Sequence, residues 1–127
     1  PLREVSDIDN SLETLVNNMR SAESIVGVCE VEATHPEFLV TTNSEGFLSR
    51  YGGKEFSEPI RRQDLSKLYF FEGTIYASTI EVFFKYRGFY HEKTLAYIVP
   101  KWKAFEIDDL IDFYCVEAIL RNKSMFQ

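Results

Sequence analysis

Three carboxylates stand within four residues of the stretch FEIDD, at Glu106, Asp108 and Asp109. Negative charges this close repel one another, so the arrangement needs solvent or a counter-ion to neutralise it. We interpret residues 104–107 (AFEI) as a short strand that leads into a helix. Because side chains two apart on a strand share a face, Glu106 and Asp108 would point the same way, with Ile107 directed into the core.

Two carboxylates at the end of a strand suit a hard cation. Mg²⁺ is bound through one or two protein carboxylates and completes its coordination with water and phosphate oxygens. In parallel α/β sheets, ligands bind beyond the carboxyl ends of the strands. We therefore predict Glu106 and Asp108 as Mg²⁺ ligands and Asp109 as the N-cap of the following helix. The alternative is that all three acids are solvated caps at a strand–helix junction.

Two other groups of residues could recognise a ligand. The two arginines of IRRQD form an anion-site candidate, because guanidinium groups bind carboxylate and phosphate in a bidentate manner. Their alternative role is a basic turn that pairs with the chain's own acids. The neighbouring aromatics Phe89 and Tyr90 of GFYHEK are either core residues or a wall for a sugar ring.

Helices and strands alternate along the chain. We predict helices over residues 6–19, 78–88 and 108–122, strands over 23–31, 72–78, 94–99 and 104–107, a hairpin over 37–51 and an irregular segment over 51–67. This order favours an α/β fold with a mixed, mainly parallel sheet flanked by helices and a hairpin excursion. Capping-box spacing places the helix starts at Ser6 with Asp9 and at Ser78 with Glu81, and Gly88 follows the end of the second helix.

Apolar side chains are predicted to face the core from two of these helices. The first helix carries one apolar stripe, and the last helix would pack much of its surface. The residues are Ile8, Leu12, Leu15, Val16 and Met19 in the first helix, and Leu110, Ile111, Phe113, Tyr114, Val116, Ala118, Ile119 and Leu120 in the last.

Composition limits the class of protein. The 127 residues are 45% hydrophobic and carry a net charge of -6, which predicts a single folded domain and argues against nucleic acid or an anionic membrane as a partner. No apolar run approaches the ~20 residues of a membrane helix. Cys29 and Cys115 lie in apolar stretches, which favours reduced, buried thiols of a cytoplasmic protein over a disulfide or a metal pair.

Five segments occur in an order that resembles the C-terminal part of the acylneuraminate (CMP-sialic acid) cytidylyltransferase family. They are PLREVSDID, VGVCEVEATHPEF, RRQDLSKLYFFEGTIYAS, GFYHEKTLAYIVP and FEIDDLIDF, and they cover nearly the whole chain. The resemblance implies a nucleotide-diphospho-sugar transferase-like fold. It also implies transfer of CMP from CTP to a nonulosonic-type keto sugar acid, with Mg²⁺ held at Glu106 and Asp108. Glu106 departs from the family, which has Asp there.

The same resemblance implies roles for residues elsewhere in the chain. Asp108 and Arg62 would be catalytic, with Arg62 on an arm over residues 51–67 that forms a homodimer. The substrate-binding residues would be Arg3, Arg62, Gln63, Phe70, Glu72, Tyr76, Phe89 and Tyr90. Phe70 and Glu72 replace an arginine and an asparagine of the family, so we expect a keto sugar acid other than N-acetylneuraminic acid.

Two further readings remain open at this point. The glycine-rich and basic loop with which the family holds CTP has no counterpart in residues 1–127, so we expect these residues alone neither to bind nor to turn over CTP. The chain could therefore be a non-catalytic remnant of the fold that binds sugar and dimerises. A divergent hydrolase that uses the same acids on a sugar phosphate is the third possibility.

Overall fold

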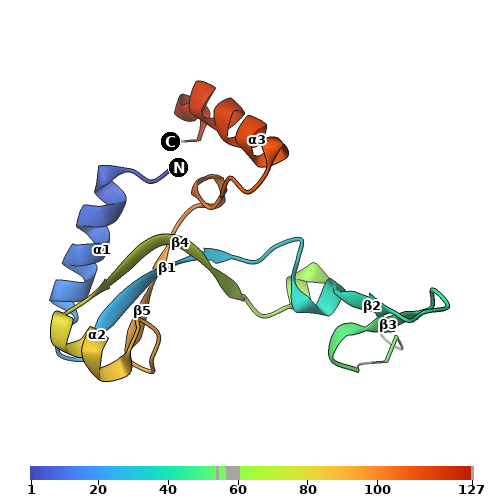
Figure 1. The fold of residues 1–127 in the computed structure, drawn as a ribbon, viewed down its shortest axis with the longest axis horizontal. Helices are drawn as coiled ribbons and strands as arrows, with labels where there is room; N and C mark the ends of the chain where they lie inside the picture. Colours follow the sequence, from blue (N-terminus) through green and yellow to red (C-terminus); the bar gives the residue numbers. More distant parts are fainter. Residues whose placement is uncertain (54, 57–60, 127) are drawn as a thin grey trace. The chain divides into compact units, whose positions relative to one another are not determined.

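The computed structural model describes residues 1–53, 55–56 and 61–126 (Figure 1). It divides into two compact units, Pro1–Cys29 with Phe70–Gln127, and Glu30–Tyr69. The first unit contains α1 (Val5–Asn17), β1 (Ser24–Glu30), β4 (Tyr69–Ser78), α2 (Ile80–Tyr86), β5 (Thr94–Ile98) and α3 (Leu110–Arg121), with short 3-10 turns at Lys101–Lys103 and Lys123–Met125. The second unit contains the strands β2 (Val40–Thr42) and β3 (Leu48–Arg50) and three 3-10 turns.

A three-stranded sheet in the order β4-β1-β5 forms the centre of the first unit. β1 and β5 are parallel, in register from Ser24 opposite Thr94 to Val28 opposite Ile98. β4 runs in the opposite direction on the other side of β1 (Figure 1). The predicted α/β fold with a mixed sheet is thus confirmed, whereas its mainly parallel character is not.

Two small apolar clusters lie in the first unit. Leu15, Ala22, Ile25 and Ile75 join α1, β1 and β4, with Ala77, Leu95 and Tyr97 packed against them. Leu2, Val116 and Ile119 join the start of the chain to α3, with Trp102 and Phe105 packed against them. β1 is buried from Ser24 to Cys29, because strands flank it on both sides.

The apolar helix faces are far more exposed than predicted. On α1 only Leu15 of the predicted stripe is buried, and Val16 is 62% exposed. The buried side of α1 carries Asp7, Ser11 and Leu15, because a buried lysine holds Asp7 on that side. On α3, Val116 and Ile119 are buried while the other six predicted packing residues are exposed.

Three local predictions need correction. α1 begins with Glu4 as N-cap, since the Glu4 N–H donates to Asp7 Oδ2 at 2.8 Å, in place of the predicted pair of Ser6 and Asp9. α2 begins with Thr79, whose hydroxyl accepts from Val82 N at 3.3 Å, in place of Ser78. Residues 104–107 form no strand, because neither edge of the described three-stranded sheet pairs with them, and Ile107 is 45% exposed.

The second unit contains the predicted hairpin. β2 and β3 are antiparallel, with Val40 opposite Arg50, and the side chain of Asn43 accepts hydrogen bonds from Glu45 N and Phe47 N in the turn. Gly46 has a φ of 87°, which a glycine adopts without steric cost. Residues 54 and 57–60 of the predicted arm lie outside the described residues.

Two observations bear on the predicted class of protein. No described helix is long and apolar enough to cross a membrane. Cys29 is buried and Cys115 is only half-buried, and neither forms a disulfide among the described residues. The full burial predicted for Cys115 is wrong, because this residue lies on the partly exposed helix α3.

Candidate functional site

The side chain of Glu72 is buried where β4 passes β1. It is 4% exposed; Thr74 N donates to Oε1 at 3.0 Å, and the Thr74 hydroxyl donates to the other oxygen. Gly27 of β1 makes this possible, because a Cβ there would overlap the Glu72 carboxylate. The carboxylate of Glu72 is therefore fixed between β4 and Gly27 of β1, with its oxygens directed at Thr74.

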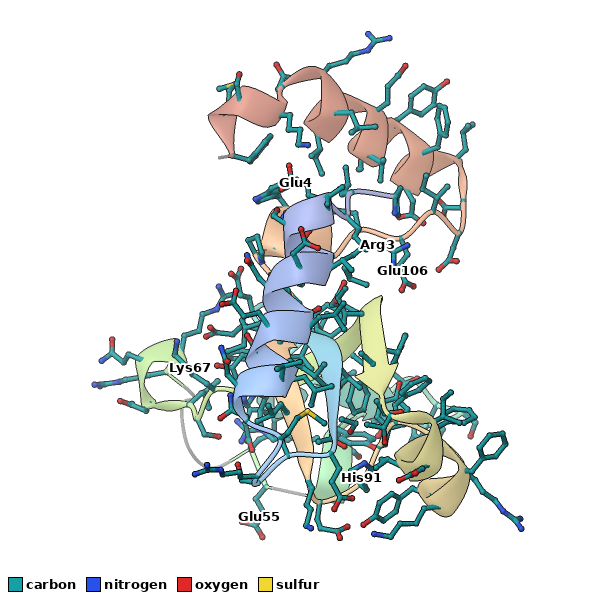
Figure 2. The ribbon with its side chains drawn as sticks, turned by 90° about the vertical axis from the view of Figure 1, so that its left-hand side faces the viewer. Arg3, Glu4, Glu55, Lys67, His91 and Glu106 are labelled. Atoms are coloured by element: carbon teal, nitrogen blue, oxygen red, sulfur yellow. The ribbon has the colours of Figure 1, made fainter. Side chains whose placement is uncertain are left out.

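An open pocket of about 220 Å³ lies beside this carboxylate. Its lining residues are Pro1, Arg3, Glu72, Gly73, Thr74, Lys103, Phe105 and Glu106. Arg3 Nη1 donates to the Thr74 carbonyl at 2.6 Å, and Glu106 Oε1 lies 3.1 Å from the position that a Cβ of Gly73 would take. Figure 2 shows Arg3 and Glu106 beside each other. The structure thus brings together three predicted site residues, Arg3, Glu72 and Glu106.

A cluster of aromatic rings adjoins the pocket. The ring centroids of Tyr76 and Phe89 are 5.5 Å apart, those of Tyr76 and Tyr90 are 6.1 Å apart, and those of Phe71 and Tyr90 are 4.4 Å apart. Three of the four predicted aromatics, Tyr76, Phe89 and Tyr90, therefore lie together, and Phe71 is an addition that the sequence analysis missed. Phe70 is 44% exposed at the start of β4.

Tyr76 connects the aromatic cluster to the pocket. Its hydroxyl lies 4.0 Å from the position that a Cβ of Gly73 would take. A hydrogen bond with Tyr90, burial, and the negative charges of Glu72 and Glu106 raise the pKa of Tyr76 to about 12. The phenol therefore stays protonated at neutral pH, and its oxygen can accept a further hydrogen bond.

The acidic stretch is arranged differently from the predicted strand. Asp109 is the N-cap of α3, as predicted, and accepts from Ile111 N at 2.7 Å and Asp112 N at 3.0 Å. Asp108 is exposed next to it, and Asp108 N donates to Asp112 Oδ2 at 3.1 Å. Only Glu106 of the predicted metal pair lines the pocket.

The carboxylate oxygens near the pocket are the kind of ligand atom that Mg²⁺ prefers. No group of three or more His, Cys, Asp or Glu residues is placed to hold a metal among the residues that the structure describes. Mg²⁺ does not need one, because it is bound through one or two carboxylates with water and phosphate oxygens. Glu106 and Asp108 offer two exposed carboxylates.

Arg62 and Gln63 belong to the second unit, where they form a 3-10 turn, Arg62–Asp64. The Arg62 guanidinium lies 5.6 Å from the centroid of the Phe38 ring, in cation–π geometry. Arg62 also lines a pocket of about 210 Å³ with His35, Ser66 and Lys67. Buried His35 orders this unit, as its Nδ1 accepts from Glu37 N and its Nε2 lies 3.2 Å from the Ser66 carbonyl.

Lys103 was missed in the sequence analysis. It is 7% exposed and lines the pocket, and its ammonium group contacts both carboxylate oxygens of Asp7, at 2.7 and 2.8 Å. A signal for this pair was present, because Asp7, Ser11 and Leu15 are spaced four apart and must share one helix face. A charge on the same face as a core leucine indicates a buried partner.

Comparison with characterised proteins gives one consistent result. Three N-acylneuraminate cytidylyltransferases from Streptococcus agalactiae, of serotypes V, III and Ia, are 30%, 29% and 29% identical to the chain over 113 residues, or 89% of its length. This chain is related to the N-acylneuraminate cytidylyltransferases. No family model matches it.

The match confirms the family resemblance and its extent over nearly the whole chain. The chain spans about a quarter of the length of these cytidylyltransferases, 26% in each case. The aligned part therefore corresponds to only a portion of each relative. The chain's own contribution to chemistry has to be argued from the pocket described above.

Proposed function

We propose that this chain provides the sugar-acid and metal-binding part of a cytoplasmic cytidylyltransferase. The enzyme would transfer CMP from CTP to a nonulosonic-type keto sugar acid. The observation that supports this most is the pocket in which Arg3 and Glu106 meet beside the Tyr76–Tyr90 aromatic pair. It occurs in a chain that is 30% identical to an N-acylneuraminate cytidylyltransferase.

Each side of the pocket suits one part of such a substrate. A guanidinium group has five N–H donors, and the Thr74 carbonyl accepts from one nitrogen of Arg3, so other donors of Arg3 are available for the substrate carboxylate. The hydroxyl oxygen of Tyr76 would accept a hydrogen bond from a sugar hydroxyl. The faces of Phe89 and Tyr90 would pack against the sugar ring.

The reaction forms a bond between the anomeric oxygen of the sugar acid and the α-phosphorus of CTP. The bond from that phosphorus to pyrophosphate breaks, and the anomeric hydroxyl loses its proton. Glu106 and Asp108 would hold Mg²⁺, which neutralises phosphate charge when it is bound. Arg3 holds the sugar acid so that its hydroxyl is oriented for attack.

Residues of the second unit extend this proposal. Arg62 and Gln63 would bind an anionic group of the substrates, and the arm over residues 51–67 would form a homodimer. The hairpin supports the need for a partner surface, because Phe47 is 68% and Leu48 56% exposed and an isolated two-stranded sheet is marginally stable in water.

The sugar acid is proposed to differ from N-acetylneuraminic acid. Glu72 provides a fixed negative charge beside the pocket, and this charge disfavours an uncharged acceptor group or a carboxylate placed next to it. Phe70 offers no polar atom. A substrate that presents a hydroxyl or an amine on this side is favoured over one that presents an acyl carbonyl.

Substitution of Asp108 tests the proposed function. In the protein that carries this sequence, Asp108→Asn should lower CTP-dependent pyrophosphate release at least about 100-fold over a range of Mg²⁺ concentrations, because one metal ligand loses its charge. Asp9→Asn, on the exposed side of α1, is the control and should retain activity. Unchanged activity of Asp108→Asn would contradict the metal assignment. An unmodified protein without turnover of any keto sugar acid would contradict the function and favour the non-catalytic reading.

A further inference from the structure

An ionic cluster with a buried pair at its centre, Lys103 and Asp7, joins three parts of the first unit that are distant in sequence. Lys103 Nζ lies 2.7 Å from Asp7 Oδ1 and 2.6 Å from Glu4 Oε2, and Lys123 Nζ lies 2.6 Å from the other oxygen of Glu4. The side chains of Lys103 and Asp7 are each 6% exposed. The Tyr97 hydroxyl donates to Asp7 at 3.4 Å. The start of α1, the turn Lys101–Lys103 and the turn Lys123–Met125 therefore meet at this cluster.

The pKa values of Glu4 and Lys103 are both shifted in the direction that favours the charged form. Hydrogen bonds from Lys103 and Lys123 lower the pKa of Glu4 to about 2. Burial acts to lower the pKa of Lys103, but its hydrogen bonds to Asp7 and Glu4 outweigh this effect and raise the pKa. The two positive and two negative charges balance.

Such a cluster is a poor means of stabilising a fold. The desolvation of buried ions offsets much of their attraction, and well-packed apolar side chains often give equal or greater stability. A buried ionic cluster does, however, fix geometry, because each charge must meet its partner in one arrangement. The role of the cluster therefore depends on which residues it holds in place.

The cluster lies next to both charged walls of the pocket. Arg3 immediately precedes Glu4, and its guanidinium group is turned to the Thr74 carbonyl. Glu106 follows Lys103 by three residues, and its carboxylate lies over Gly73. Lys103 itself lines the pocket, but its ammonium group is occupied by Asp7 and Glu4.

We propose that Lys103 is a positioning residue of the sugar-acid pocket: by pairing with Asp7 and Glu4, it fixes Arg3 and Glu106 in their places in the pocket lining. This inference rests on the proposed function for its substrate but not for its geometry. Lys103 acts through Arg3, whose remaining N–H donors are thereby presented to a carboxylate. Loss of the Lys103–Asp7 pair should loosen Arg3 while leaving the reacting groups intact.

The charge-neutral double variant Lys103→Met/Asp7→Asn tests the inference. It removes the buried pair without leaving either partner as an isolated charge, and the pair of Glu4 and Lys123 remains. Asp7→Asn alone is a milder variant that keeps Lys103 paired with Glu4 and serves if the double variant does not fold. Lys93→Met is the matched control, because Lys93 pairs at 2.8 Å with Glu23, which does not line this pocket.

Two measurements distinguish positioning from a purely structural role. The first is the NMR signal of the Arg3 guanidinium group, whose motion should be restricted in the unmodified protein, because Nη1 donates to the Thr74 carbonyl, and freer in the double variant. The second is steady-state kinetics. The KM for the keto sugar acid should rise about tenfold, the effect of one weakened charge-assisted hydrogen bond, while kcat stays within about threefold. Lys93→Met should change neither measurement.

The outcomes separate this inference from the proposed function. An Arg3 signal that is unchanged in a folded double or single variant would overturn the positioning role, whatever the kinetics show. A loss of Arg3 order in a protein whose unmodified form turns over no keto sugar acid would support the positioning role and overturn the proposed function. A fall in kcat with unchanged KM would also overturn the inference, because Arg3 would then not act in sugar-acid binding.

Discussion

The central strand of the first unit and the hairpin strands of the second lie in opposite environments. β1 is buried from Ser24 to Cys29, and Ile25 is completely inaccessible to solvent. Every residue of β2 is exposed, and Leu48 of β3 is 56% exposed. β1 has a strand on each side, whereas β2 and β3 pair only with each other among the described residues. The strand with a neighbour on each side is the buried one.

This difference extends to the candidate ligand-binding residues. Glu72 and Arg3 of the first unit are fixed by hydrogen bonds that connect separate segments of the chain. Arg62 of the second unit is held by local stacking on Phe38. A pocket built by the first unit can therefore be preorganised, while Arg62 is positioned by a contact within the second unit.

The largest expected difference between the units is in the free energy of unfolding lost when an apolar side chain is truncated to alanine. Ile25→Ala should destabilise the protein by about 2–5 kcal/mol, because it removes a fully buried side chain and leaves a cavity in the sheet. Leu48→Ala should change the free energy of unfolding by less than about 0.5 kcal/mol in a monomer. Denaturant unfolding of both variants measures this. A large cost for Leu48→Ala that grows with protein concentration would show that the hairpin is covered in a dimer.

A smaller effect is expected from the contact between β1 and β4. Gly27→Ala should cost about 1–3 kcal/mol, because the new methyl group collides with the buried Glu72 carboxylate and lies 3.2 Å from Ile75 N. Gly88→Ala is the control, since a Cβ at Gly88 meets no described atom within 4 Å. Thermal unfolding compares the two. Equal stability of both variants would show that the Glu72 carboxylate does not occupy the site against β1.

The smallest expected effect is the contribution of Glu4 to the pH dependence of stability. The folded-state pKa of Glu4, about 2, lies below its ordinary value of 4.5. The stability contributed by Glu4 is thus fully present above about pH 4.5 and is lost as the pH falls toward 2. Glu4→Gln should reduce the fall in Tm between about pH 4.5 and pH 2. Glu30→Gln should change it less, because Glu30 and Lys67 pair on the surface of the second unit. Identical profiles for Glu4→Gln and the unmodified protein would contradict the role of Glu4 in the cluster.

Local sequence signals determined much of the secondary structure. The run of Val and Ile in β1, the turn residues around Asn43 and Gly46, and the Asp109 cap of α3 depend on the chemistry of a few adjacent residues. These features could be predicted because each needs only its neighbours in sequence. The family order of segments likewise led to Tyr76, Phe89 and Tyr90, which the structure places together.

Only the tertiary structure decided which charges are buried and which apolar residues are not. Glu72 looks from its sequence position like an exposed residue of a strand, but Gly27 of another strand provides the space in which it is buried. Asp7 looks like a surface acid until Lys103, 96 residues away, is seen to pair with it. Conversely, the apolar stripe of α1 is largely exposed because no described element covers it. Burial depends on contacts between distant segments, and a sequence pattern records only which residues could be buried if such a segment were present.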